Sequence, residues 1–149
     1  MKRRFDKYYT EAKKHLDRLS FAFSVLQDNE LFPLNSRNVE AVMQDYKLTA
    51  VLDQIVYRYS KLQDVLAKLI RNYLYLKGEN VENLTMVDVL NVAEKFGIGI
   101  SKEKWFELRE LRNILVHEYE DEKEKIAQTL NRIYQELDYL EKLLRRLAI

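Results

Sequence analysis

One stretch of the sequence constrains the fold more than any other. Between residues 52 and 76 an apolar side chain recurs at every third or fourth position, in the series Leu52, Ile55, Tyr59, Leu62, Leu66, Leu69, Tyr73 and Leu76. Steps of three and four place all of these side chains on one side of an α-helix, and such a seam needs other helices to bury it. Gly78 follows where a helix C-terminus is expected. The stretch predicts a long helix inside a bundle.

Similar seams lie at both ends of the chain. The first is formed by Phe5, Tyr8, Ala12, Leu16, Leu19, Phe23 and Leu26, and predicts an amphipathic helix that ends near Gln27. The last is formed by Ile126, Leu130, Ile133, Leu137, Leu140, Leu144 and Leu147. A connection with Pro33 follows the first helix, and a short helix is expected from Arg37 to about Tyr46.

Two further helices are predicted from capping residues. Thr85, with Asp88 three residues later, predicts the start of a helix that runs to Phe96. Ser101 predicts the cap of a helix from Lys102 to about Tyr119. The acidic run from Glu118 to Glu124 is interpreted as a joint before the last seam.

The composition agrees with a helical fold. Three glycines and one proline in 149 residues are too few for the turns of a β-sandwich or barrel. We therefore predict an all-α, antiparallel, four- to five-helix up-and-down bundle that forms a single domain over residues 1–149. No signal peptide and no apolar run of membrane-spanning length are recognised, so a cytoplasmic location is expected. Without cysteine, and without His/Asp/Glu spacing typical of a metal site, we expect neither a metal nor a cofactor.

The helix predicted from Lys102 contains a residue that does not suit a bundle core. Trp105, Leu108, Leu115 and Tyr119 share one stripe, and Arg112 lies on it as well. Because arginine stays protonated, a buried guanidinium must be paired or must face a cleft.

One of the chain's two histidines, His117, follows five residues after Arg112. On an ideal helix the two side chains lie about 140° apart. They converge on one ligand only if the helix ends or bends near Val116.

A purely structural interpretation stays open. Arg112 would then bridge an acidic residue on a neighbouring helix, and His117 would interact with the dipole at a helix end. The other histidine, His15, lies beside the first apolar seam and is expected to be solvated or partly packed.

The pattern Arg112, four residues, His117, one residue, Tyr119 resembles the signature of the HepT branch of the HEPN superfamily, which Asn113 also matches. Residues 95–125 are similar to the C-terminal half of nucleotidyltransferase substrate-binding proteins. The Phe-Glu pattern common in those relatives is missing from the long helix, where Tyr57-Arg58-Tyr59 stands instead. No residue of that helix is therefore assigned to the site, although Asp64 is a candidate for supporting it.

The resemblance implies a bundle of HEPN type and a metal-independent endoribonuclease, the toxin of a toxin–antitoxin pair. Arg112, Asn113 and His117 would be catalytic, and Tyr119 would be the tyrosine that a partner minimal nucleotidyltransferase, the antitoxin, modifies with AMP. RNA would be the substrate, and a homodimer would bring two copies of the motif together. The alternative is a non-catalytic helical subunit that docks a nucleotidyltransferase.

Overall fold

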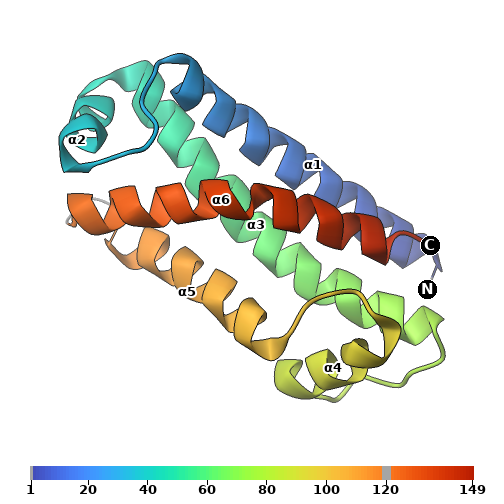
Figure 1. The fold of residues 1–149 in the computed structure, drawn as a ribbon. Coiled ribbons are helices and arrows are strands. Elements are labelled where there is room, and N and C mark those ends of the chain that lie inside the picture. The colour runs from blue at the N-terminus through green and yellow to red at the C-terminus, as the bar shows by residue number, and fades with distance from the viewer. Residues whose placement is uncertain (1, 119–121) are drawn as a thin grey trace.

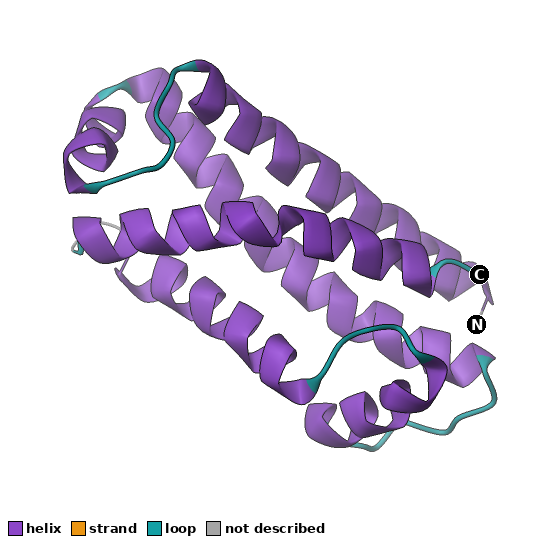
Figure 2. Cartoon of the chain, in the orientation of Figure 1, coloured by secondary structure: helices purple, strands orange, loops and turns teal. Residues whose placement is uncertain are grey.

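The computed structural model describes residues 2–118 and 122–149. Over these ranges the chain forms six α-helices, one 3-10 turn and no strand (Figures 1 and 2). The elements are α1 (Lys2–Asp28), α2 (Ser36–Gln44), α3 (Tyr46–Leu76), α4 (Met86–Ala93), η1 (Glu94–Phe96), α5 (Lys102–Glu118) and α6 (Lys123–Leu147). The predicted all-α class is confirmed.

The four long helices make the body of the molecule. Helices α1 and α3 share the most extensive contact, α6 packs against both α1 and α5, and α5 packs against α3. Figure 1 shows α2 across the end of the body where α1 leaves and α3 begins, and α4 at the opposite end, beside the last turns of α3. The apolar seams face inward, because each helix can bury its stripe only against its neighbours.

The long seam is buried as predicted. Its members from Leu52 to Tyr73 are all buried, and Leu76, in the last turn, is half-buried. Helix α3 ends at Leu76, and Gly78 just beyond it has a φ of 90°, a left-handed conformation that glycine adopts without strain.

The short helix predicted from Arg37 to about Tyr46 is present as α2. The helix begins at Ser36 and ends at Gln44, short of Tyr46. Asp45 separates α2 from α3 because it has extended backbone angles and its carboxylate accepts hydrogen bonds from the N–H groups of Lys47 and Leu48, at 2.9 and 3.1 Å. This N-cap starts a new helix directly after the end of α2.

The caps of the next two helices are confirmed. Thr85 accepts a hydrogen bond from the N–H of Asp88 at 3.3 Å, and Ser101 accepts one from the N–H of Lys104 at 3.1 Å. The helix that begins after Thr85 changes to a 3-10 turn after Ala93, and Gly97 ends that turn in a left-handed conformation.

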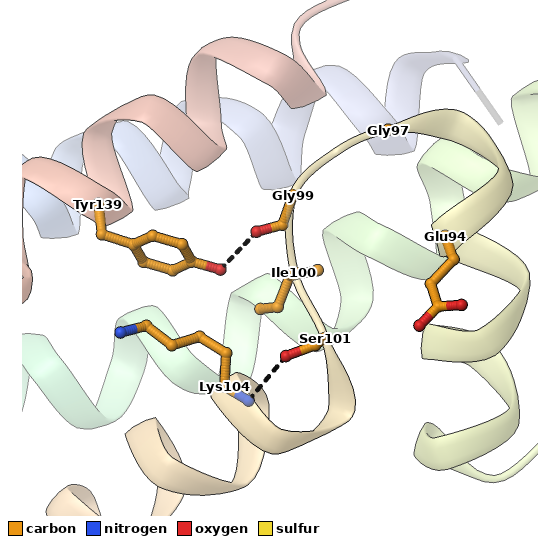
Figure 3. Close-up of a pocket in the computed structure, with 7 residues that line it drawn as sticks. All are labelled: Glu94, Gly97, Gly99, Ile100, Ser101, Lys104 and Tyr139. Atoms are coloured by element: carbon orange, nitrogen blue, oxygen red, sulfur yellow. Dashed lines mark hydrogen bonds between the residues drawn. The ribbon is translucent and has the colours of Figure 1, made fainter.

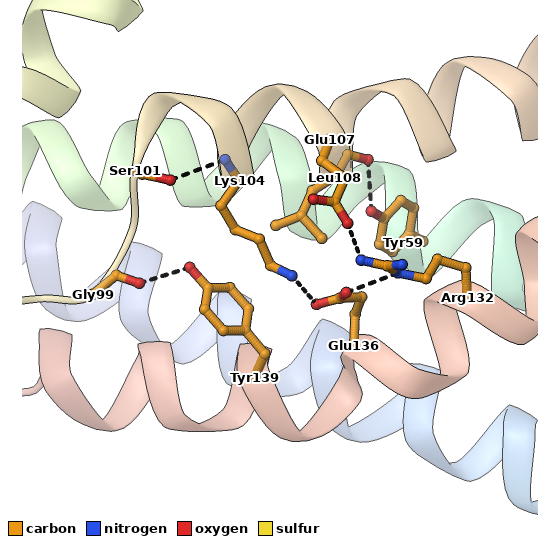
Figure 4. A network of polar contacts seen from close by, with 9 residues as sticks. All are labelled: Tyr59, Gly99, Ser101, Lys104, Glu107, Leu108, Arg132, Glu136 and Tyr139. Carbon is orange, nitrogen blue, oxygen red and sulfur yellow. Dashed lines mark hydrogen bonds and ion pairs between the residues drawn. The ribbon is translucent and has the colours of Figure 1, made fainter.

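A polar network fixes α5 against α6 and α3 (Figure 4). The carboxylate of Glu136, only 5% exposed, accepts hydrogen bonds from Lys104 Nζ at 2.6 Å and Arg132 Nε at 3.0 Å. From α3, the buried Tyr59 hydroxyl donates to the carbonyl of Leu108 at 2.6 Å. The helix with the candidate motif is therefore held on two sides.

None of the helices in the described ranges is both long and apolar enough to span a lipid bilayer.

Candidate functional site

The stripe on α5 is buried except at Arg112. Trp105, Leu108 and Leu115 are core residues, whereas Arg112 is half-buried. Its Nε atom is fully buried without a hydrogen-bond acceptor. No ion pair joins its guanidinium to a carboxylate in the described part of the chain, in contrast to Arg132, which pairs with both Glu136 and Glu107. The bridge that the structural interpretation needs is absent there.

His117 lies in the last turn of α5, and its side chain is exposed. Helix α5 continues past Val116 to Glu118 and is not interrupted between Arg112 and His117, so the condition for convergence within one chain is not met. At 3.6 residues per turn, Arg112 and His117 point about 140° apart. Asn113 is half-buried. Tyr119 lies outside the described residues.

A groove of about 390 Å³ lies between α3 and α5, beside the motif. It is lined by Asp53, Val56, Tyr57, Ser60, Leu115 and Val116. Two of these apolar side chains are open to solvent, Tyr57 at 50% exposed and Val116 at 48%. Val116 immediately precedes His117 and lies one turn after Arg112, so the groove adjoins the residues that the motif singles out.

The contribution of α3 to this groove was not predicted. The sequence named Asp64 as a candidate support, but Asp64 is exposed and does not line the groove. Tyr57 does line it, at the position where the family pattern was not found. Only the packing of α3 on α5 reveals this, since residues 57 and 116 are far apart in the sequence.

A larger cavity, of about 580 Å³, lies at the other end of α5 (Figure 3). Two of its polar side chains already have partners: Tyr139 donates a hydrogen bond to the carbonyl of Gly99 at 2.8 Å, and Lys104 pairs with Glu136. Burial raises the pKa of Tyr139 to about 12, so its hydroxyl is a poor proton donor near neutrality.

His15 is partly buried between α1 and α3, which agrees with the predicted packed or solvated side chain. Its Nδ1 lies 2.9 Å from Arg58 Nη1. Burial and the neighbouring Arg58 lower the pKa of His15, so the neutral ring accepts the hydrogen bond from the guanidinium. Across the described ranges, no group of His, Asp and Glu side chains has the arrangement of a metal site.

Comparisons of the chain with protein-family models, with curated proteins and with solved structures found no match.

Proposed function

We propose that the protein is a metal-independent endoribonuclease of HEPN/HepT type, the toxin of a toxin–antitoxin pair. The observation that supports the proposal most is the burial of Arg112 without a carboxylate partner in the described residues. A half-buried guanidinium on a core stripe, without a carboxylate partner in the described residues, has a positive charge available for an anion. A phosphodiester is such an anion, and a groove lined by Leu115 and Val116 lies one turn further along α5.

The residues suit RNA cleavage by the 2′-hydroxyl. A base removes the 2′-proton as the 2′-oxygen bonds to phosphorus, and an acid protonates the 5′-oxygen as its bond to phosphorus breaks. Histidine titrates close enough to neutrality to perform either transfer. Arg112 would stabilise the negative charge that gathers on the phosphoryl oxygens, and Asn113 would donate one further hydrogen bond.

A homodimer supplies what a single chain lacks. Arg112 and His117 diverge around a regular α5, and one motif holds only one histidine for two proton transfers. A twofold axis near the exposed end of α5 would bring two copies of both residues into one groove. The proposal therefore includes a symmetric dimer with a shared site.

The test is cleavage of RNA by the purified protein in the presence of EDTA. Wild-type protein should cut, and His117→Ala should cut at least roughly a hundredfold more slowly, as expected for the loss of a general acid or base. The matched control is His15→Ala, which removes the other histidine and should retain most activity. The nuclease proposal is wrong if wild-type protein leaves RNA intact and His117→Ala has the same effect as wild type when expressed in cells.

Regulation by a minimal nucleotidyltransferase is part of the same proposal. The Tyr119 hydroxyl would attack the α-phosphorus of ATP on that partner, with release of pyrophosphate. An AMP two residues from His117 adds negative charge and bulk where substrate phosphate must bind. Mass spectrometry after co-expression should find the adduct only on the peptide with Tyr119, and none in Tyr119→Phe. Unmodified wild-type protein under these conditions would refute the regulation.

The alternative is a non-catalytic subunit that docks a nucleotidyltransferase, with Arg112 and His117 holding a nucleotide or an acidic neighbour. The exposed apolar side chains of Tyr57 and Val116 favour a contact at this place. The EDTA assay separates the two functions, because a docking subunit leaves RNA intact with or without His117.

A further inference from the structure

The outer face of the α1–α3 pair carries a concentration of positive charge. Its members are Arg3, Arg4 and Lys7 from α1, and Arg58, Lys61 and Lys68 from α3, which we call the α1–α3 basic stripe. The same two helices also carry acidic residues, among them Glu11 and Asp64. The whole chain has a net charge of only +1, so this local excess is balanced by acidic residues elsewhere.

The charges of the stripe are not neutralised by ion pairs. Within the described ranges, none of the six cations lies in a salt bridge, whereas most cations near the C-terminus of α6 do. Arg58 donates to the neutral ring of His15, and its Nε is buried without an acceptor. Unpaired cations gathered on one face are the electrostatic footprint of a polyanion-binding surface.

Tyrosine rings alternate with these cations. The Nζ of Lys68 lies 5.8 Å from the centre of the Tyr8 ring, and Arg58 Cζ lies 5.2 Å from that of Tyr57. Tyr8 also lines a hollow of about 370 Å³ together with Arg3, Arg4 and Lys7. Cations for phosphates, combined with aromatic faces for bases, are the features by which proteins bind single-stranded nucleic acid.

The stripe is continuous with the groove beside α5. Tyr57 belongs to both, because its ring contacts the stripe's cations and also lines the groove with Val116. Residues 57, 61 and 68 lie along one side of α3, over about 16 Å of helix axis. The charged surface therefore runs from the end of α5 that carries His117 to the N-terminal turns of α1.

We propose that the α1–α3 basic stripe binds single-stranded RNA and leads the strand to the groove at Arg112 and His117. The role of the groove rests on the proposed nuclease function, but binding along the stripe does not need cleavage. The same charges would attract an anionic membrane. A membrane surface, however, would not stack on the tyrosines that line a hollow and a groove. The substrate is thus RNA that is unpaired near the cleavage point.

The first experiment measures binding of a fluorescent, 2′-O-methylated single-stranded oligonucleotide, which cannot be cleaved. Lys7→Glu/Lys68→Glu should weaken binding at least roughly tenfold. Each lost phosphate contact should also reduce the slope of log affinity against log salt by about 0.7. The matched control is Lys95→Glu/Lys102→Glu, which makes the same change in charge at exposed positions outside the stripe. Equal weakening in both pairs, or none in the first, would overturn the proposal.

The second experiment tests the aromatic contribution. Tyr57→Leu should weaken single-strand binding about tenfold, the effect expected for one lost base stack. Tyr46→Leu changes a 95% exposed tyrosine of the same helix, far from the stripe's cations, and should have no effect. Preference for an oligonucleotide duplex, or binding to anionic vesicles that Lys7→Glu/Lys68→Glu abolishes while RNA binding persists, would overturn the assignment to single-stranded RNA.

The experiments distinguish a failure of the proposal for the α1–α3 basic stripe from a failure of the nuclease proposal. If wild-type protein cleaves RNA and Lys7→Glu/Lys68→Glu binds and cleaves normally, the stripe proposal is wrong and the nuclease stands. If oligonucleotide binding depends on the stripe but no RNA is cut, the nuclease proposal is wrong.

Discussion

Two partly or fully buried charged side chains of this protein differ in their hydrogen-bond partners. Glu136 is among the most buried polar residues, yet both of its oxygens have cationic partners in Lys104 and Arg132. Arg112 is less buried but has no such partner in the described residues. The first arrangement stabilises the fold, because its hydrogen bonds offset desolvation. The second has a cost in stability that is typical of binding sites.

This difference predicts opposite effects of two similar substitutions. Arg112→Leu places an apolar side chain on an apolar stripe and should raise the free energy of unfolding by about 1 kcal/mol. Lys104→Leu removes one partner of buried Glu136 and should lower it by about 1–3 kcal/mol. Urea denaturation measures both. Destabilisation by Arg112→Leu comparable to that of Lys104→Leu would show that Arg112 has a structural partner.

His15 gives a prediction about pH. Because its pKa is lowered in the folded protein, the unfolded chain binds more protons below the ordinary value of 6.5. The contribution of neutral His15 to stability is therefore complete above pH 6.5 and is lost as the pH falls through the lowered pKa. His15→Gln should make the acid-side decline of the unfolding free energy, measured by urea denaturation at several pH values, shallower. Equal curves for His15→Gln and wild type would contradict the packing of a neutral ring against Arg58.

At the scale of elements, the sequence predicts most of the fold because the signals are local. The seam of α3 and the caps at Thr85 and Ser101 depend on neighbours within one turn. The boundary between α2 and α3 was predicted near Tyr46, but the capping role of Asp45 was not, because the apolar pattern alone does not show it. The groove depends on which α3 residues face Val116, and that is decided by packing between distant segments.

Substitution of Asp45 tests whether its side chain stabilises the start of α3. Asp45→Ala removes the acceptor of two N–H groups at the start of α3 and should lower the free energy of unfolding by about 1–2 kcal/mol. The neighbouring substitution Gln44→Ala, at an exposed position, should change it by less than about 0.5 kcal/mol. Thermal and urea unfolding give the values. Similar effects of the two substitutions would mean that the cap contributes nothing to stability.

At the scale of the whole molecule, the charged features are on different sides of one scaffold. The Glu136 network holds α5 from the side of α6, while the groove and the α1–α3 basic stripe lie along α3. Since α5 stays helical through Glu118, one chain does not aim Arg112 and His117 at the same point. The proposed nuclease is therefore an assembly of two copies, and its activity must depend on both.

Mixing of wild-type and His117→Ala subunits measures that dependence directly. If the two histidines of a dimer share one site, mixed dimers are inactive, and activity falls with the square of the wild-type fraction. An equal mixture, allowed to exchange subunits, should then keep about one quarter of the wild-type RNase activity. Retention of about one half, in proportion to the wild-type subunits present, would contradict a site built from two protomers.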